Sequence, residues 1–375
     1  MKITADDKIP FLKGALEQYA EVEYLPGGKI SPANLKITDA LITRTRTKCN
    51  VALLNGTPVK FIATATIGFD HIDTEYCGKN GIFWTNAPGC NSSSVAQYIC
   101  STLLYISIRS SIALRGKTLG IIGVGNVGSK VAKVAKALGM NLLLNDPPRE
   151  RKEGPGSFVS LDRVLSEADF ITMHVPLETE GKDKTFHLAD ENFFSRMNGK
   201  QYFINSSRGE VTHSSALKNA LRNGKIAGAV LDVWENEPEI DRELLDMVLI
   251  GTPHIAGYST DGKANGTSMS VNALAKYFKL DIHDWYPSSV PLPEKTEINL
   301  DSLENCSFDE KLFKAVSFTY DQLADDKRLR SSPETFEKQR ADYPLRREFP
   351  VFSVKSQDKN ILNALKNLGF KEIAS

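Results

Sequence analysis

A glycine-rich turn between an apolar run and a helical run constrains the fold of this chain more than any other feature. Residues Thr118–Ile122 predict a buried strand, the turn Gly123–Gly128 reads GVGNVG, and Ser129–Leu138 has the spacing of a helix. A strand, a G-x-G-x-x-G turn and a helix in this order are typical of a dinucleotide-binding βαβ unit. The sequence therefore predicts a parallel sheet with a dinucleotide site at this turn.

Each glycine of the turn is expected to have its own steric role. Gly123 permits the tight turn, Gly125 lets the backbone approach a pyrophosphate, and Gly128 lets the helix pack against the strand. Asp146 follows the next predicted strand, 18 residues after Gly128. An acid there accepts hydrogen bonds from the ribose and repels a 2′-phosphate, so NAD is favoured over NADP. The plainer alternative is that Asp146 only caps a turn before two prolines.

Short apolar runs alternate with longer mixed segments from residue 2 to 86 and again from 118 to about 251. The predicted strands are Lys2–Ala5, Val22–Leu25, Ala40–Thr43, Lys60–Thr64, Ile82–Thr85, Thr118–Ile122, Asn141–Asn145, Phe170–Val175, Gln201–Asn205, Gly228–Leu231 and Val248–Ile250. Helices are predicted over Phe11–Tyr19, Asn50–Leu54 and, between the two blocks, Ser92–Leu114. Such alternation favours an α/β fold with two Rossmann-like or flavodoxin-like parallel-sheet domains around a cleft. A smaller α+β unit is expected near the C-terminus.

Composition excludes several classes of protein. Lys plus Arg and Asp plus Glu both number 46, so the neutral chain has no general electrostatic reason to bind nucleic acid or an anionic membrane. The five cysteines are scattered without a C-x-x-C pair, which indicates free thiols and a reducing compartment, and we expect no metal site. No signal peptide and no membrane-spanning apolar run is visible, so we expect a cytoplasmic protein.

Three charged residues follow predicted strands of the second block. They are Arg208 in NSSRG, Glu237 in DVWENEP and His254 in TPHIAGY. Ligands of open α/β sheets bind outside the carboxyl ends of the strands. Taken singly, these residues could be a loop ion pair, a solvated turn residue and a core histidine. Together they supply a carboxylate-binding guanidinium, a base and a group that orients the base, as oxidation of a 2-hydroxy acid requires.

With these motifs in place, the sequence resembles the D-isomer-specific 2-hydroxyacid dehydrogenases over nearly its whole length. The stretches that carry the resemblance are Phe61–Asp73, Asn86–Asn91, Gly120–Gly128, Leu231–Glu235 and Pro253–Ser259. The first and last of them favour the subgroup that oxidises 4-phosphoerythronate in pyridoxal phosphate biosynthesis. The resemblance implies an NAD-dependent oxidoreductase that acts on a small phosphorylated 2-hydroxy acid.

The resemblance also implies roles for individual residues, beginning with Arg208, Glu237 and His254 as the catalytic set. The implied NAD contacts are Gly123, Gly125, Asn126, Val127, Gly128, Asp146, Val175, Ser206, Ser207, Arg208, Asp232 and Gly257. The implied substrate contacts are Thr45, Thr66 and Tyr258. Two positions depart from the family pattern: Thr45 stands where many relatives have Ser, and Asn265 stands where Arg is expected.

The cations that bind the substrate phosphate are left open. Arg44 and Arg46 flank Thr45 at a predicted strand end, but they could equally form a solvated loop. A second hypothesis is that Arg346 or Arg347 reaches the cleft of a partner subunit, the alternative being a solvated charge run.

The domain prediction is a substrate-binding domain of residues 1–93 and 257–286, an NAD-binding Rossmann domain of residues 94–256, and a C-terminal dimerisation domain of residues 287–375. The resemblance implies a homodimer. Two rival functions remain: a sibling enzyme such as phosphoglycerate dehydrogenase, and an NAD-sensing protein like the transcriptional corepressors built on this fold. A regulatory ferredoxin-like domain would show two βαβ units after residue 290, and turnover would exclude the corepressor.

Overall fold

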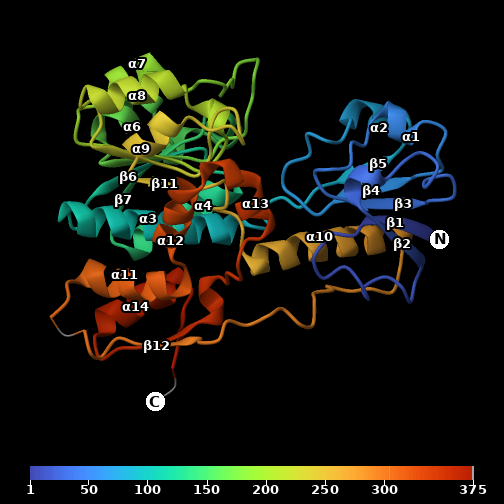
Figure 1. Cartoon of the computed structure of the whole chain (residues 1–375). Coiled ribbons are helices and arrows are strands. Elements are labelled where there is room, and N and C mark those ends of the chain that lie inside the picture. Colours follow the sequence, from blue (N-terminus) through green and yellow to red (C-terminus); the bar gives the residue numbers. More distant parts are fainter. Residues whose placement is uncertain (304, 374–375) are drawn as a thin grey trace. The chain divides into compact units, whose positions relative to one another are not determined.

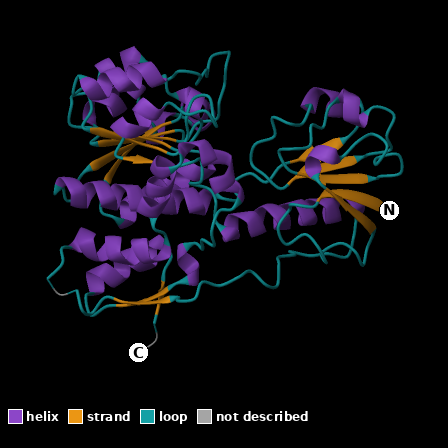
Figure 2. Ribbon diagram, in the orientation of Figure 1, coloured by secondary structure: helices purple, strands orange, loops and turns teal. Residues whose placement is uncertain are grey.

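The computed structural model describes residues 1–303 and 305–373, and the chain divides into two compact units (Figure 1). The first unit comprises Met1–Asn91 and Ser259–Pro291, and the second comprises Ser92–Tyr258 and Leu292–Ser375. Each unit contains a parallel sheet with helices packed against it (Figure 2). The predicted α/β class is therefore confirmed, whereas the three-domain boundaries stay a prediction.

The first unit is built on a five-stranded parallel sheet in the order β2-β1-β3-β4-β5. Its elements are β1 (Lys2–Asp6), β2 (Glu21–Leu25), β3 (Ala40–Thr43), α1 (Val51–Leu54), β4 (Phe61–Thr64), α2 (Thr74–Lys79), β5 (Phe83–Thr85) and α10 (Thr260–Phe278), with a 3-10 turn at Gly27–Lys29. This strand order is the flavodoxin-like one. All five strands lie within one residue of their predicted bounds, because their apolar runs are buried on both faces of the sheet.

The helix predicted over Phe11–Tyr19 is wrong. Phe11 and Gly14 both have left-handed backbone, with φ of 63° and 87°, so the segment runs as successive turns. Leu12 and Leu16 are nevertheless fully buried in the core of the unit. The apolar spacing therefore reported burial correctly, and the backbone satisfies it without forming a helix.

The second unit contains a six-stranded parallel sheet in the order β11-β10-β9-β8-β6-β7. Its elements up to Tyr258 are α3 (Ser92–Ser110), β6 (Thr118–Ile122), α4 (Asn126–Ala137), β7 (Asn141–Asn145), α5 (Pro147–Glu153), α6 (Leu161–Glu167), β8 (Phe170–Met173), α7 (Glu191–Ser195), β9 (Tyr202–Asn205), α8 (Ser214–Arg222), β10 (Gly228–Leu231), α9 (Arg242–Met247) and β11 (Ile250–Gly251), with 3-10 turns at Pro155–Ser157 and Gly209–Val211. In Figure 1, α6 to α9 cover one face and α3 and α4 cover the other. The strand order reverses between β6 and β8, and such a switch point is where open α/β sheets bind ligands.

The segment after residue 291 adds a small three-stranded parallel sheet in the order β12-β13-β14. Its elements are β12 (Glu297–Asn299), α11 (Phe308–Thr319), α12 (Gln322–Ser331), α13 (Phe336–Ala341), β13 (Ser353–Lys355), α14 (Lys359–Leu368) and β14 (Lys371–Glu372), with 3-10 turns at Pro333–Thr335 and Phe349–Val351. Helices α11 and α14 pack against α3 and α4 and share one hydrophobic core with them. Only β13, α14 and β14 form a compact βαβ unit in the described residues, so the two units of a ferredoxin-like domain are not seen there.

Two predictions about chemistry outside the sheets can also be compared with the structure. All five cysteines are free thiols, and four of them are buried. None of the helices in the described part of the chain is long and apolar enough to cross a membrane.

Candidate active site

The glycine turn between β6 and α4 leaves open space beside the helix N-terminus. At Gly123, where φ is +86°, a Cβ would lie 2.5 Å from the carbonyl oxygen of His174. At Gly128 a Cβ would lie 2.1 Å from the carbonyl oxygen of Gly123. Beside Gly125, however, a Cβ would meet no atom within 4 Å. The two outer glycines are thus required by packing, whereas Gly125 faces a space that a pyrophosphate fits, next to the free N–H groups of α4.

Asp146 lies at the end of β7 and binds two backbone N–H groups. Its Oδ2 accepts a hydrogen bond from the N–H of Val124 at 2.8 Å, which ties it to the glycine turn. Its Oδ1 accepts from the N–H of Arg149 at 3.0 Å and caps α5. The capping role that the sequence offered as an alternative is therefore present, and it coexists with a position beside the glycine turn.

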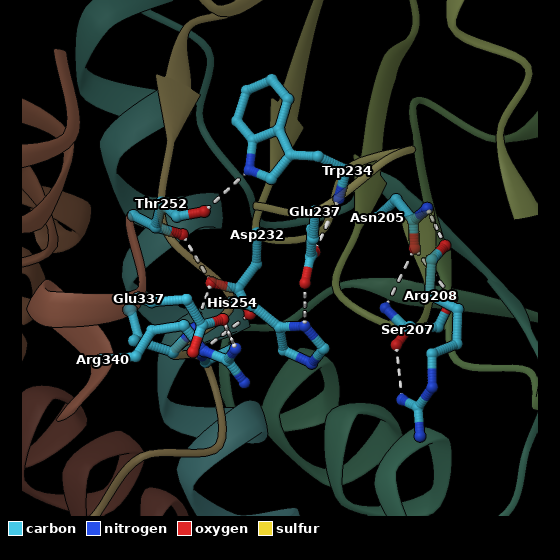
Figure 3. Close-up of polar contacts among 12 residues, drawn as sticks. Asn205, Ser207, Arg208, Asp232, Trp234, Glu237, Thr252, His254, Glu337 and Arg340 are labelled. Carbon is cyan, nitrogen blue, oxygen red and sulfur yellow. Dashed lines mark hydrogen bonds and ion pairs between the residues drawn. The ribbon is translucent and has the colours of Figure 1, made fainter. Parts of the chain in front are cut away.

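The loop after β9 is held by the side chain of Asn205. Its Oδ1 accepts hydrogen bonds from the N–H and hydroxyl of Ser207 at 2.9 and 2.8 Å, and its amide donates to the carbonyl of Arg208 at 2.9 Å. These bonds fix the backbone from which the Arg208 side chain extends, and its Nη1 donates to the Ser207 carbonyl (Figure 3). The hydroxyl of Ser206 is buried and has no hydrogen-bond partner among the described residues. An unpaired buried hydroxyl in this loop fits a bound polar ligand.

His254 and Glu237 form a hydrogen-bonded pair although they lie on different loops. Nδ1 of His254 is 2.8 Å from Oε2 of Glu237, and the other oxygen of Glu237 accepts from the N–H of Trp234 at 2.9 Å (Figure 3). Burial raises the pKa of Glu237, but the hydrogen bond and charge of His254, with smaller contributions from Trp234 and Arg340, more than reverse this. The pKa of Glu237 is therefore lowered, which keeps it an anion beside the imidazole.

The backbone around His254 is left-handed, with φ of 55°, and Asp232 holds it in place. Oδ1 of Asp232 accepts from the hydroxyl of Thr252 at 2.6 Å and from the N–H of Ile255 at 2.8 Å, and Oδ2 accepts from the N–H of Ala256 at 2.8 Å. The carboxyl of Asp232 is 1% exposed. Its first role in this structure is to shape the loop that carries the histidine.

Tyr258 and Arg340 lie beside this pair, and Arg340 is the residue that the sequence did not reveal. The guanidinium carbon of Arg340 is 5.6 Å from the ring centroid of Tyr258, and its Nη1 donates to Glu337 at 2.7 Å. Arg340 comes from α13, a helix without a recognisable motif. No pattern in the chain could have placed it next to residues of the second block.

The predicted exposure of Arg346 and Arg347 is wrong, because they are only 3% and 7% exposed. The guanidinium of Arg346 lies over the ring of Tyr320 at 3.7 Å and donates to Gln97 and to the carbonyls of Ser94 and Ile255. Its donors therefore serve the interior of its own unit, so neither a solvated charge run nor a reach to a partner describes Arg346.

The remaining predicted NAD contacts lie close to the glycine turn or the His254 loop. Val175 follows β8 and lies against the turn, since its Cγ1 would be 2.8 Å from a Cβ at Gly123. Asn126 and Val127 begin α4, and Gly257 follows the loop of His254. The second unit thus brings the predicted NAD and catalytic residues to one edge of its sheet.

The first unit carries the other predicted substrate contacts. Thr66 donates a hydrogen bond to the carbonyl of Gly68 at 2.9 Å, and Thr45 is exposed. Arg44 donates to the carbonyl of Lys8 at 3.0 Å. Burial and the charge of Arg44 lower the pKa of Lys263, so a second cation lies close to Arg44 that the sequence did not suggest.

Asn265 has a structural role at the position where the family pattern predicts Arg. Its amide donates to the carbonyl of Cys90 at 2.9 Å and so ties α10 to the end of the first segment of the unit. The substitution replaces a cation with an internal hydrogen bond, and the cation of this region is Lys263, one half-turn earlier on the same helix.

Two family models match the chain. Residues 106–256 match the D-isomer specific 2-hydroxyacid dehydrogenase, NAD binding domain, and residues 291–369 match a Domain of unknown function (DUF3410). Among solved structures, D-lactate dehydrogenase from Aquifex aeolicus, complexed with NAD and lactic acid, is similar with a TM-score of 0.60 and 29% identity, covering 76% of this chain and 97% of that one. The open space at Gly125 and the unpaired Ser206 hydroxyl fit this cofactor. The chain is an NAD-dependent dehydrogenase.

Curated relatives match over nearly the full length. The erythronate-4-phosphate dehydrogenase of Bacteroides thetaiotaomicron is 55% identical over 360 residues, covering 94% of this chain and 99% of that one. The enzymes of the same name from Porphyromonas gingivalis and Escherichia fergusonii are 41% and 40% identical and cover 99% and 100% of this chain and 100% and 99% of their own lengths. The chain belongs to the erythronate-4-phosphate dehydrogenase branch of the D-isomer specific 2-hydroxyacid dehydrogenase family.

Proposed function

We propose that this protein oxidises 4-phospho-D-erythronate to 2-oxo-3-hydroxy-4-phosphobutanoate with NAD, in pyridoxal 5′-phosphate biosynthesis. The observation that carries the proposal is the 2.8 Å bond between His254 and Glu237 at the sheet edge that also bears the glycine turn. Full-length relatives named for this substrate support it.

His254 acts as the general base in this proposal. Because Nδ1 bonds to Glu237, the Nε2 atom is left to take the proton from the C2 hydroxyl of the substrate. The C2–H bond breaks at the same time, and its electron pair leaves as hydride while the C2–O bond becomes a carbonyl. When bound, NAD supplies the acceptor for that hydride. Glu237 fixes the tautomer of the imidazole and stabilises the imidazolium that forms.

Arg208 binds the substrate carboxylate. A guanidinium offers two parallel N–H groups to a carboxylate and fixes its orientation, and its charge polarises the carbonyl that develops at C2. The hydrogen bonds of Asn205 support this role, because they fix the loop backbone at Ser207 and Arg208.

The other predicted residues complete the proposal. NAD is bound by Gly123, Gly125, Asn126, Val127, Gly128, Asp146, Val175, Ser206, Ser207, Arg208, Asp232 and Gly257, and the substrate is bound by Thr45, Thr66, Tyr258, Arg44 and Arg46. The domains are residues 1–93 with 257–286 for substrate, 94–256 for NAD and 287–375 for dimerisation. The protein works as a homodimer in the cytoplasm.

A side-by-side assay tests the function. NADH formation is measured with 4-phosphoerythronate, 3-phosphoglycerate and D-lactate under the same conditions. The proposal expects kcat/KM for 4-phosphoerythronate to exceed the other two by at least about 10²-fold, because a site built for specific anionic groups rejects substrates that leave its polar groups unpaired. A higher value for 3-phosphoglycerate would favour the sibling enzyme, and no turnover of any substrate would favour an NAD-sensing protein.

A further inference from the structure

Arg340 has more hydrogen-bond donors than its own unit uses. A guanidinium carries five N–H donors, and the one acceptor that Arg340 binds among the described residues is Oε1 of Glu337, at 2.7 Å. Its Nε is buried and has no hydrogen-bond partner in that part of the chain. Buried donors in native proteins are almost always paired, so an orphaned one beside a catalytic site indicates that a ligand completes it.

The surroundings of Arg340 keep water away without neutralising it fully. The rings of Tyr258 and Phe336 lie 5.6 and 5.9 Å from its guanidinium carbon. Glu337 is about half exposed, so its charge is screened by solvent. The charge of Arg340 also reaches Glu237, whose pKa it helps to lower. The guanidinium is therefore a partly desolvated cation next to the base of the proposed reaction.

The positions of two arginines around the base match the shape of the proposed substrate. Figure 3 shows the imidazole of His254 between Arg208 on one side and Arg340 on the other. The substrate carries a carboxylate at C1 and a phosphate at C4, and the reacting carbon C2 lies between these two anions. A base with a guanidinium on either side fits an acid with an anion at either end, and Arg208 already accounts for the carboxylate.

We propose that Arg340 binds the phosphate of the substrate from within the same subunit, through the donors that Glu337 leaves open. This assignment rests on the proposed function and extends it to the residue that distinguishes phosphorylated from unphosphorylated acids. It also replaces Arg346 as the arginine of the C-terminal segment that meets the substrate, because the donors of Arg346 are used inside the unit. A guanidinium fork suits phosphate because it pairs with two oxygens at once.

The test compares Arg340→Gln and Arg340→Lys with Lys338→Gln, which removes one positive charge from an exposed position of the same helix. For each protein the KM and kcat for 4-phosphoerythronate, the Ki of unphosphorylated erythronate, the Kd of NAD and the Tm are measured. We expect Arg340→Gln to raise the KM roughly 10–10²-fold, the loss expected for charge-assisted hydrogen bonds, and to change the Ki of erythronate by less than about twofold. Arg340→Lys should recover part of the loss, since it keeps the charge but not the fork, and Lys338→Gln should match the wild type.

Two results would overturn the assignment. An unchanged KM in Arg340→Gln would remove Arg340 from the site. Equal losses for the phosphorylated and unphosphorylated acids would mean that Arg340 acts only through Glu237 and His254 or through folding, and the Tm and the Kd of NAD separate these two causes. Failure of the proposed function is seen separately, as the absence of wild-type turnover of 4-phosphoerythronate.

Discussion

Nδ1 of His254 lies 2.8 Å from Oε2 of Glu237, and each residue is held by its own support. The backbone N–H of Trp234 binds the second oxygen of Glu237, while the buried carboxyl of Asp232 holds the loop that carries His254. The geometry of the pair thus comes from two loops that follow neighbouring strands, β10 and β11. Pre-positioning of this kind fixes the imidazole tautomer before any substrate binds.

Replacement of Glu237 with Gln should leave the loop in place but remove the charge that stabilises the imidazolium. We expect kcat to fall about 10²–10⁴-fold, as for other enzymes that lose the carboxylate behind a histidine base. The acid limb of the pH dependence of kcat/KM should move to lower pH, because an imidazole without a neighbouring anion holds its proton less strongly. Steady-state rates from pH 5 to 10 check both; an acid limb at the wild-type pH would mean that Glu237 does not govern the base.

The same substitution has a consequence for stability. Because the pKa of Glu237 is lowered in the folded state, its ionised form stabilises the protein above the ordinary glutamate pKa of about 4.3, and this contribution is lost as the pH falls through the lowered value. The Tm difference between wild type and Glu237→Gln should therefore be largest near neutral pH and shrink below about pH 4. Thermal unfolding at pH 7, 5 and 3.5 measures it, and a difference that grew on acidification would contradict the sign.

Gly125 and Gly128 should respond in opposite ways to added side chains. Gly125→Val places its side chain in open space, so Tm should stay near the wild-type value while the affinity for NAD falls at least about tenfold. Gly128→Ala forces a Cβ against the carbonyl of Gly123 and should lower the stability by about 2 kcal/mol. Calorimetric titration with NAD and thermal unfolding distinguish the two; a Gly125→Val protein that binds NAD normally would place the pyrophosphate elsewhere.

Asp146 should make the enzyme prefer NAD. A 2′-phosphate would meet this carboxylate, and the nearby Arg149 cannot compensate because its Nε and Nη2 already bind Glu153 at 2.8 and 2.7 Å. We expect kcat/KM to favour NAD over NADP by about 10²-fold or more, and Asp146→Asn to narrow this ratio at least about tenfold. Equal values for the two cofactors in the wild type would show that Asp146 does not contact the ribose.

Arg208 should not tolerate Lys, although the charge is kept. A lysine cannot reproduce the planar fork, so kcat/KM for 4-phosphoerythronate should fall by about 10²-fold or more. Arg163→Lys, on the exposed face of α6, makes the same chemical change far from the sheet edge and serves as the control. Similar rates in both variants would remove Arg208 as the carboxylate ligand.

The sequence was most informative where local pattern and burial coincide. The strand runs Ala40–Thr43 and Gly228–Leu231 were predicted to the residue, since apolar runs bounded by polar ones are what strands buried on both faces require. The same logic failed over Phe11–Tyr19, where buried leucines are presented by turns whose left-handed residues leave no periodic trace. Asn265 shows a further limit, because an internal hydrogen bond to Cys90 could not be read from its helix.

Contacts between distant segments lay beyond the sequence. The His254–Glu237 pair was predicted because both residues follow strands of one parallel sheet, whose carboxyl ends share an edge. Arg340 and Arg346 come from helices and loops after the sheet is complete, so only packing decides which arginine is buried and which lies beside the base. The family resemblance directed attention to the right segment but to the wrong arginine.

The most direct test of the proposed mechanism is the rate of 4-phosphoerythronate oxidation by His254→Asn. Asparagine tolerates the left-handed backbone at this position and so leaves the loop intact, but it cannot take a proton. We predict that kcat falls about 10²–10⁴-fold while the Kd of NAD and the Tm stay close to the wild-type values. Turnover near the wild-type rate in a variant that still binds NAD would show that His254 is not the base, and the mechanism would be wrong.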